Sequence, residues 1–208
     1  MASIRTTAQA AARQATRTTL LEAARELLRE RRWNDITMSD VSTAVGVSRQ
    51  TLYNEFGSRK GFVQAYLLYD ADRILSAVDH AIETAGPEPA ITIEHAFLVF
   101  LETIAEDPLA VTVLSGEDPD GLLALVTTRG GPVLQIAAYR LAAAIGAKWP
   151  NAMPADVQLL AEQLVRLAIS HAALPDDGDT AATAKSIAAL LTPFAELALL
   201  RASITDAE

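Results

Sequence analysis

Apolar side chains recur along most of the chain at the three- and four-residue spacing of an amphipathic helix. In the first such segment, which ends near Arg32, the apolar face is formed by Leu20, Leu21, Ala24, Leu27 and Leu28. Breaks rich in Pro and Gly separate the later segments, which predict helices at about 59–84, 90–106, 108–115, 119–128, 132–148, 154–173 and 179–202. No segment shows the sustained two-residue alternation of a half-buried strand. The pattern therefore predicts an all-α chain.

Two short helices joined by a tight turn are predicted between residues 37 and 56. Thr37 and Asp40 have the spacing of a capping box, which opens a helix. Gly46 can adopt the positive φ that ends this helix, and Ser48 can cap a second one. This arrangement is typical of a DNA-binding helix-turn-helix. An ordinary helical hairpin inside a core is the alternative.

Charge is unevenly distributed. The net charge is −9, but residues 1–62 hold 10 Lys and Arg against 6 Asp and Glu, whereas residues 63–208 hold 7 against 20. A basic segment joined to an acidic body favours local phosphate binding, with the body facing away from the nucleic acid. We divide the chain into a flexible basic arm (1–14) carrying Arg5 and Arg13, a helix-turn-helix DNA-binding domain (15–62) and a helical regulatory domain (63–208) for ligand binding and dimerisation.

The second short helix carries short or planar hydrogen-bonding groups instead of the Lys and Glu of an ordinary solvated helix. These candidate DNA-binding residues are Ser48, Arg49, Gln50, Thr51, Tyr53 and Asn54. Arg can bond guanine at two points, and Gln and Asn can do the same with adenine. Tyr hydroxyls and helix N-termini commonly hold phosphates. We therefore predict that this helix reads double-stranded DNA.

At this point a family resemblance becomes specific. The run from Thr37 to Arg59 resembles the DNA-binding domain of the TetR family of repressors, above all in Gly46-Val47-Ser48, Thr51-Leu52-Tyr53 and Phe56-Gly57-Ser58. The resemblance covers about residues 16–66. It implies phosphate contacts from Thr37, Tyr53 and Arg59. It implies base contacts mostly from Ser48, Arg49, Gln50 and Thr51.

Two positions depart from the commoner pattern of that family. Ser42 stands where Ala is frequent, which is a mild change. The family usually has Lys and then Glu after Ser58, whereas this chain has Arg59 and Lys60. We expect Arg59 to keep the phosphate contact and Lys60 to strengthen non-specific DNA affinity.

The last two predicted helices are broadly apolar, and we expect them to form a homodimer interface. The predicted interface residues are Leu160, Leu164, Leu167, His171, Ile187, Leu190, Leu191, Phe194 and Leu197. The alternative is that these stripes face only the core of their own chain. Dimerisation, which the resemblance also implies, would set two reading helices about 34–36 Å apart, one turn of B-DNA.

A ligand cavity is expected among the helices of the regulatory domain. Its candidate lining residues are Phe97, Phe100, Leu101, Leu114, Leu123, Tyr139, Arg140, Trp149 and Met153. The aliphatic character of this set favours an apolar effector, fatty-acid-like or acyl, over a flat cationic dye; ordinary core packing is the alternative. Three roles are open for Arg140: snorkelling to solvent, pairing with Glu102 or Asp107, or receiving an acidic or thioester headgroup.

Other classes of protein fit poorly. The chain has no Cys, and its three His residues lie on different predicted helices without metal-ligand spacing, so we expect no metal, no cofactor and no enzymatic activity. No uninterrupted apolar run reaches membrane-spanning length, and no apolar signal core opens the chain, so we expect a cytoplasmic protein without a membrane partner. We predict a dimeric repressor released from a palindromic operator by an apolar effector. The alternative is a ligand-independent architectural or constitutive regulator.

Overall fold

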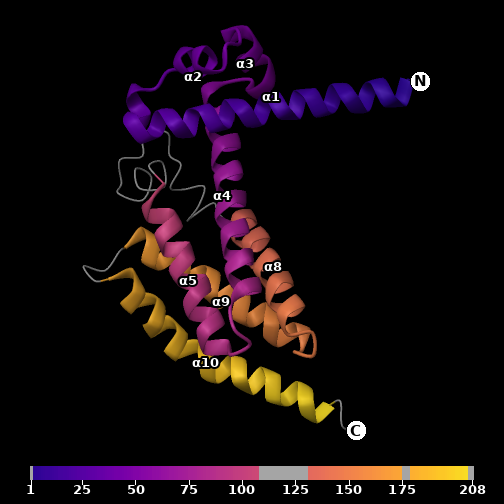
Figure 1. Cartoon of the computed structure of the whole chain (residues 1–208), viewed down its shortest axis with the longest axis vertical. Helices are drawn as coiled ribbons and strands as arrows, with labels where there is room; N and C mark the ends of the chain where they lie inside the picture. The colour runs from indigo at the N-terminus through magenta and orange to yellow at the C-terminus, as the bar shows by residue number, and fades with distance from the viewer. Residues whose placement is uncertain (1, 108–130, 175–178, 206–208) are drawn as a thin grey trace. The chain divides into compact units, whose positions relative to one another are not determined.

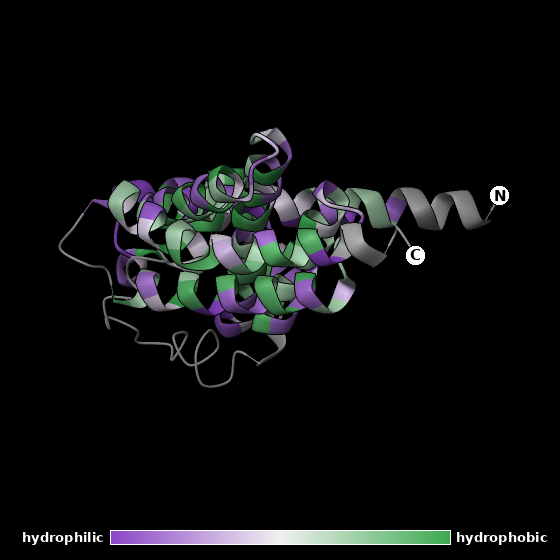
Figure 2. Ribbon diagram, turned by 90° about the horizontal axis from the view of Figure 1, so that it is seen from below, coloured by the Kyte–Doolittle hydropathy of each residue, from purple (hydrophilic) through white to green (hydrophobic). Residues whose placement is uncertain are grey.

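The computed structural model describes residues 2–107, 131–174 and 179–205 of the chain. Within these ranges it contains eight α-helices, one short 3₁₀ turn and no β-strand, so the all-α prediction is confirmed (Figure 1). Hydrophobic and hydrophilic residues alternate along the helical ribbons, in keeping with the amphipathic pattern of the sequence (Figure 2). Helices are therefore the only regular elements in the described part of the chain.

Most helices begin and end close to their predicted bounds. They are α1 Ala2–Glu30, α2 Met38–Val45, α3 Arg49–Phe56, α4 Arg59–Thr84, α5 Pro89–Ala105, α8 Gly131–Lys148, α9 Pro154–Ala173 and α10 Thr180–Thr205, with the 3₁₀ turn η1 Trp33–Asp35 between α1 and α2. The helices predicted at 108–115 and 119–128 lie outside the described residues. The other helix ends could be predicted from capping residues and prolines, because these residues act within one turn of the chain.

The prediction of a separate flexible arm over residues 1–14 needs correction. From Ala2 onward this segment is helical and continuous with the rest of α1. The segment lacks an apolar period, but it is rich in Ala and contains Arg and Gln, which are strong helix formers. Neither Gly nor Pro interrupts it. Intrinsic helix propensity therefore explains why α1 includes a segment in which the hydrophobic pattern alone predicted no helix.

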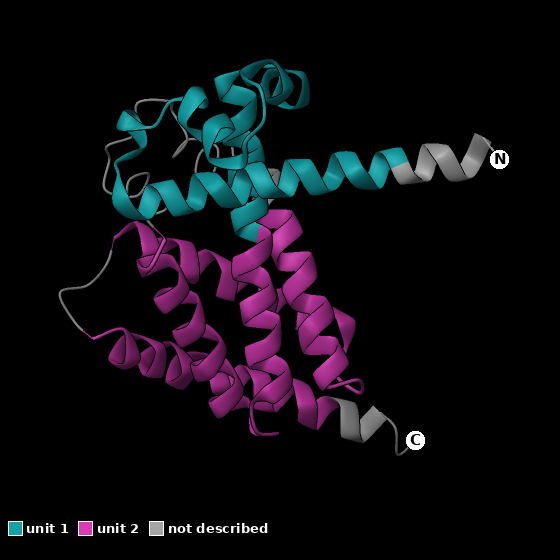
Figure 3. Cartoon of the chain, turned by 45° about the horizontal axis from the view of Figure 1, so that its top comes forward, with its two compact units in different colours: residues 1–71 teal, residues 72–208 magenta. Residues whose placement is uncertain are grey.

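The chain divides into two compact units, Met1–Ala71 and Asp72–Glu208 (Figure 3). The division falls within α4, later than the predicted boundary after residue 62. The first turns of α4 explain this, because Phe62, Val63 and Tyr66 are fully buried in the core of the first unit. The N-terminal part of α4 thus belongs to the DNA-binding unit.

The first unit is built around a small core with two short helices on one side of α1. α2 and α3 lie together there (Figure 1). Its fully buried large side chains are Leu20, Trp33, Ile36, Val41, Leu52, Phe62, Val63 and Tyr66. They come from every helix of the unit and from η1. Each short helix is therefore fixed by the same core.

The second unit packs the C-terminal part of α4 with α5, α8, α9 and α10. α10 packs mainly on α5, and α8 packs mainly on α9. One apolar cluster runs through the unit and includes Ile82 of α4, Phe97 of α5, Ile145 of α8, Leu160 of α9 and Ile187 of α10. This cluster makes the second unit a helical domain with its own core.

Two cations of α8 hold α4 within this unit. Arg140 donates from Nε to Asp79 Oδ2 (2.7 Å) and from Nη2 to Ser76 Oγ (2.7 Å), and it also forms an ion pair with Asp72. Burial opposes the charge of Arg140, but the bonds to Asp79 and Asp72 outweigh burial and raise its pKa above the usual value. Lys148 Nζ donates to the carbonyls of Ile82 (2.7 Å) and Ala85 (2.9 Å) at the end of α4.

The role of Arg140 is a second correction. Its predicted pairing with Glu102 or Asp107 is wrong: its partners lie on α4, and Asp107 pairs with Arg73 (3.5 Å). All three nitrogens of the guanidinium donate to side chains of α4, so this helix and not Glu102 or Asp107 supplies the partners of Arg140. Residues 72, 76 and 79 lie on one face of α4, and the sequence of α8 alone carries no signal of a contact with this face.

Candidate nucleic-acid interface

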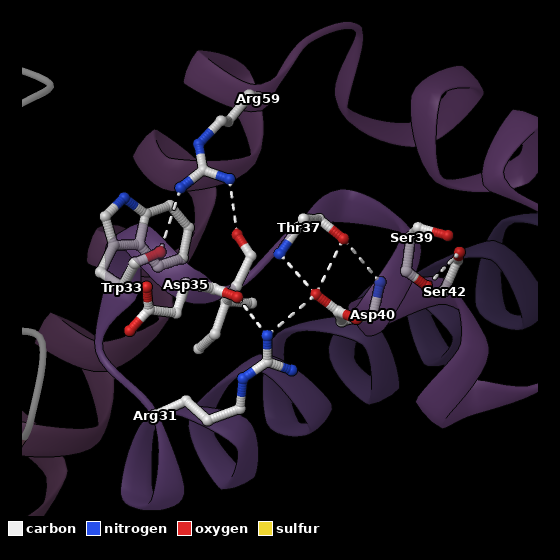
Figure 4. Close-up of polar contacts among 9 residues, drawn as sticks. Arg31, Trp33, Asp35, Thr37, Ser39, Asp40, Ser42 and Arg59 are labelled. Carbon is white, nitrogen blue, oxygen red and sulfur yellow. Dashed lines mark hydrogen bonds and ion pairs between the residues drawn. The ribbon is translucent and has the colours of Figure 1, made fainter.

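The helix-turn-helix begins with the predicted capping box (Figure 4). The Asp40 backbone N–H donates to Thr37 Oγ1 (3.1 Å), and the Thr37 backbone N–H donates to Asp40 Oδ2 (2.7 Å). The Thr37 hydroxyl also bonds Asp40 Oδ2 (2.8 Å). Gly46 closes α2 at φ +74°, in the left-handed region that favours glycine. The turn into α3 is thus built locally, as the sequence predicted.

The N-terminus of α3 is also capped as predicted. Ser48 Oγ accepts the backbone N–H of Thr51 (3.0 Å) and lies 2.8 Å from the Thr51 hydroxyl. Leu52 and Phe56 point inward and are buried. Ser58 Oγ then accepts the backbone N–H of Gly61 (3.0 Å) in the first turn of α4. α3 is therefore a short helix with a defined start and a fixed inner face.

The outer face of α3 carries paired polar side chains. Arg49, Gln50 and Asn54 are exposed, and Tyr53 is half-buried. Gln50 Nε2 donates to Asn54 Oδ1 (2.8 Å), while Arg49 Nη2 donates to the Tyr53 hydroxyl (3.3 Å) with its guanidinium 5.4 Å from the Tyr53 ring centroid. Both pairs have the i, i+4 spacing of helix neighbours. They link the outward-facing polar side chains in pairs, and Arg49, Gln50 and Asn54 remain exposed.

Arg59 has a different environment from the one expected of a phosphate ligand (Figure 4). It donates from Nη1 to the Ile36 carbonyl (2.7 Å) and from Nη2 to the Trp33 carbonyl (3.2 Å). Its guanidinium also lies 4.5 Å from the Trp33 ring centroid. Arg59 thus fastens the start of α4 to η1, while Lys60 beside it is exposed.

Two arginines of α1 contact α3, and the sequence analysis did not assign them this role. Arg13 forms an ion pair with Glu55 (2.8 Å), and Arg17 Nη1 donates to the Glu55 backbone carbonyl (3.1 Å). The guanidinium of Arg17 lies 4.4 Å from the centroid of the Phe56 ring. One feature of the sequence could have indicated this contact. Arg13 and Arg17 are four residues apart, on one face of a helix, in a stretch that contains no acidic residue before Glu22.

The predicted dimer residues fall into three groups by burial. Leu160, Leu164 and Ile187 are buried in the core of their own unit, so their assignment to an interface is wrong. Leu167, Leu191 and Phe194 are partly buried against that core, and His171 lies edge-on to Phe97 with ring centroids 6.0 Å apart. Leu190 and Leu197 are 65% and 44% exposed. Two faces of these helices are thus apolar, and the sequence pattern could not separate them.

The predicted ligand residues are also divided. Phe97 and Leu101 are buried, Phe100 packs against the same core, and Trp149 donates from its indole N–H to the Pro87 carbonyl (3.3 Å). Tyr139 and Met153 are 76% and 46% exposed, so they do not line the interior of the described body. Leu114 and Leu123 lie outside the described residues.

Comparison with known proteins decides the family. Residues 20–66 match the family model described as bacterial regulatory proteins, tetR family, and residues 89–193 match the one described as bacterial tetracyclin repressor, C-terminal domain. The chain belongs to the TetR family of transcriptional regulators. Members of this family bind DNA operators and act as dimers. They are generally not enzymes.

Similar TetR-family proteins cover nearly the whole chain. The HTH-type transcriptional regulator AlkX of Mycobacterium tuberculosis is 39% identical over 186 residues, which is 89% of this chain and 88% of that protein. The crystal structure of the TetR family repressor AlkX from Dietzia sp. strain DQ12-45-1b, described as implicated in biodegradation of n-alkanes, is 30% identical. It aligns with a TM-score of 0.76 and covers 88% of this chain and 96% of that chain.

A third relative matches over about a third of the chain. The regulator EthR of Mycobacterium tuberculosis is 36% identical over 73 residues, 35% of this chain and 32% of that protein.

Among the described residues, no group of three or more His, Asp or Glu side chains is arranged to hold a metal ion. One described stretch, Thr180–Arg201, is long and apolar enough to cross a membrane by length and composition, and only 28% of it is buried.

The capping box predicts that ionised Asp40 stabilises the folded protein and that this contribution is lost at low pH. Backbone and side-chain hydrogen bonds from Thr37 hold the pKa of Asp40 below its ordinary value of 3.8, and Arg31 adds to this. Because the folded pKa is depressed, this stabilisation is complete above the unfolded pKa and is lost as the pH falls through the folded one. Asp40→Asn should therefore lower the urea midpoint at pH 6, and the difference from wild type should shrink below about pH 4.

The matched control for this experiment is Glu30→Gln, which changes an exposed carboxylate at the end of α1. A deficit in Asp40→Asn that is equally large at pH 6 and pH 3 would show that the ionised carboxylate of Asp40 does not stabilise the helix-turn-helix.

Proposed function

We propose that this chain is a dimeric repressor that binds a palindromic operator and is released from it by an apolar small-molecule effector. The observation that carries the DNA-binding part is the outer face of α3, where Arg49, Gln50 and Asn54 stand exposed on a capped helix-turn-helix. The membership of the TetR family supports the same conclusion. An exposed row of planar hydrogen-bonding groups is suited to reading base edges in the major groove.

Each exposed group has a chemical role in this proposal. Arg49 offers two parallel donors to guanine O6 and N7, and the amides of Gln50 and Asn54 suit adenine. The hydroxyls of Ser48 and Thr51 remain near the same end of the helix and can accept or donate to bases. Phosphate contacts come from Thr37, Tyr53 and the exposed Lys60, which position the helix without reading sequence.

A single substitution separates base reading from phosphate binding. Arg49→Ala should weaken the operator more than random DNA, by about 1–3 kcal/mol, because a bidentate contact to guanine is lost. Lys60→Ala should weaken both DNAs alike and reduce the salt dependence of binding. Fluorescence anisotropy titrations on the two duplexes measure this difference. Equal losses on both duplexes for Arg49→Ala would remove it from the base-reading set.

Dimerisation is proposed from the exposed face of α10. Leu190, Leu197 and Leu200 are 65%, 44% and 62% exposed and recur at intervals of seven and three residues, so they form one stripe on the helix. A contiguous apolar stripe of this kind is unusual on the surface of a monomer. A second copy of the chain, packed about a two-fold axis, would cover the stripe with the same stripe of its partner.

Disruption of this stripe should abolish operator binding without touching the reading helix. Leu190→Glu places a charge in the proposed interface, where burial without a partner is strongly unfavourable. Light scattering should show monomers, and operator affinity should collapse. Ile136→Glu, an equally exposed apolar position on α8, is the matched control and should leave the dimer intact. A wild-type chain that is monomeric at micromolar concentration would overturn the dimer proposal.

The effector is proposed to be apolar, fatty-acid-like or acyl. The interior of the second unit is aliphatic and aromatic, and Arg140 and Lys148 are already bonded to groups of α4. A lipid-like molecule fits such surroundings better than a cationic dye. The similar repressor from Dietzia is described as implicated in biodegradation of n-alkanes, which are long apolar chains. The proposed effectors of this chain are therefore long-chain apolar molecules as a class.

Release of the operator should depend on chain length. Burial of each further methylene contributes about 0.8 kcal/mol, so each should lower the half-effective concentration about fourfold until the site is filled. The measurement is operator release titrated with fatty acids, acyl thioesters and cationic dyes. Release by the dyes alone would exclude the lipid-like effector. Absence of release by every compound would favour the ligand-independent regulator instead.

A further inference from the structure

The reading helix α3 is too short to fix its own direction. Its eight residues, Arg49–Phe56, form two turns, and isolated helices of that length are unstable in water. Its orientation therefore depends on contacts with other parts of the unit: Leu52 anchors its middle in the core, and other groups hold its two ends. The N-terminal end is held by the Ser48 cap and by the turn at Gly46. The C-terminal end has no basic residue of its own in the last turn.

α1 supplies the missing contact at that C-terminal end. Arg17 donates to the Glu55 carbonyl (3.1 Å), one of the last carbonyls of α3, and places its guanidinium 4.4 Å from the Phe56 ring centroid. Arg13, one helical turn earlier, pairs with the Glu55 carboxylate (2.8 Å). Cations near a helix C-terminus also complement the helix dipole. Both arginines thus act on the same end of α3.

The same end is also contacted by α4. The rings of Phe56 and Phe62 meet edge to face with centroids 4.8 Å apart. Any Cβ at Gly61 would collide with the Phe56 carbonyl oxygen, so the backbones approach too closely for another residue. The Phe56 end of α3 is therefore held by both Arg17 of α1 and Phe62 of α4.

We propose that Arg17, supported by Arg13, orients α3 and so determines operator specificity without contacting a base. This inference rests on the reading face assigned to α3 under the proposed function. Base contacts need hydrogen-bond geometry within a few tenths of an ångström. A tilt of α3 about its capped end would move Arg49 and Gln50 away from their bases. Contacts to phosphates made by flexible side chains such as Lys60 would tolerate the same tilt.

A phosphate contact by Arg17 is the competing role, and salt dependence separates the two. Each phosphate contact that is lost reduces the slope of log affinity against log salt by about one. A positioning residue leaves that slope unchanged, because it releases no counterion. The half-buried guanidinium of Arg17, directed at a carbonyl and a ring, favours positioning.

The experiment compares Arg17→Ala, Arg17→Lys and the control Arg29→Ala. Arg29 lies on the exposed face of the same helix and bonds within α1, to Glu26 (3.1 Å). Each variant of the full chain is titrated with the operator and with random duplex at four salt concentrations. Arg17→Ala should lower the ratio of operator to random affinity about tenfold, the equivalent of one base contact, with the salt slope unchanged. Arg29→Ala should leave the ratio as in the wild type.

Arg17→Lys tests geometry against charge. Lys keeps the positive charge but lacks the planar group that bonds a carbonyl while stacking on a ring, so it should fail to restore the ratio. Partial unfolding lowers the active concentration for both duplexes equally and leaves the ratio unaffected. An unchanged ratio, or equal losses with a reduced salt slope, would overturn the proposal. A wild type without preference for any sequence would instead overturn the proposed function.

Discussion

The DNA-binding unit depends on holding one eight-residue helix in a single direction. α3 lacks the length to be stable alone, so its shape and orientation are set by groups outside it. Ser48 caps its start, Leu52 anchors its middle in the core, and Arg17 and Phe62 fix its end. These contacts come from the preceding turn, α1 and α4. The outer face of α3 is then not needed to stabilise the helix, and in the proposed function its residues contact DNA.

Arginine performs two kinds of task in this unit. Arg17 donates to one backbone carbonyl and Arg59 to two, each guanidinium also lies against an aromatic ring, and each joins two elements. Arg49, in contrast, is exposed on the reading face. The acidic excess of residues 63–208 confines favourable phosphate contacts to the basic segment. The net charge of the whole chain therefore says little about what its N-terminal unit binds.

The sequence predicted what local chemistry decides. The capping box of Thr37 and Asp40, the Ser48 cap and the left-handed Gly46 lie within a few residues of their partners, and all three are confirmed. Contacts between distant residues could not be derived in this way. Arg59 reaches carbonyls 23 and 26 residues earlier in the chain, and Arg140 reaches α4 across 61 residues or more.

For the apolar helices of the second unit, the hydrophobic pattern could not predict which face is buried. Leu160, Ile187 and Leu190 look alike in a hydrophobic pattern, yet the first two are in the core and the third is exposed. Helices that are apolar on two faces do not reveal which face meets a partner. The DNA-binding residues were easier to propose, because planar polar groups on a short helix are an uncommon pattern with a specific chemical use.

The most direct test of the account is selection of bound duplexes from a random-sequence library by the wild-type chain, followed by measurement of the protein-to-DNA ratio. A symmetric dimer with one reading helix in each subunit should select an inverted repeat. The centres of the two half-sites should lie about 10–10.5 base pairs apart, or a multiple of that spacing, with two chains bound per repeat. Enrichment of no sequence, or of a single half-site bound by one chain, would contradict the account.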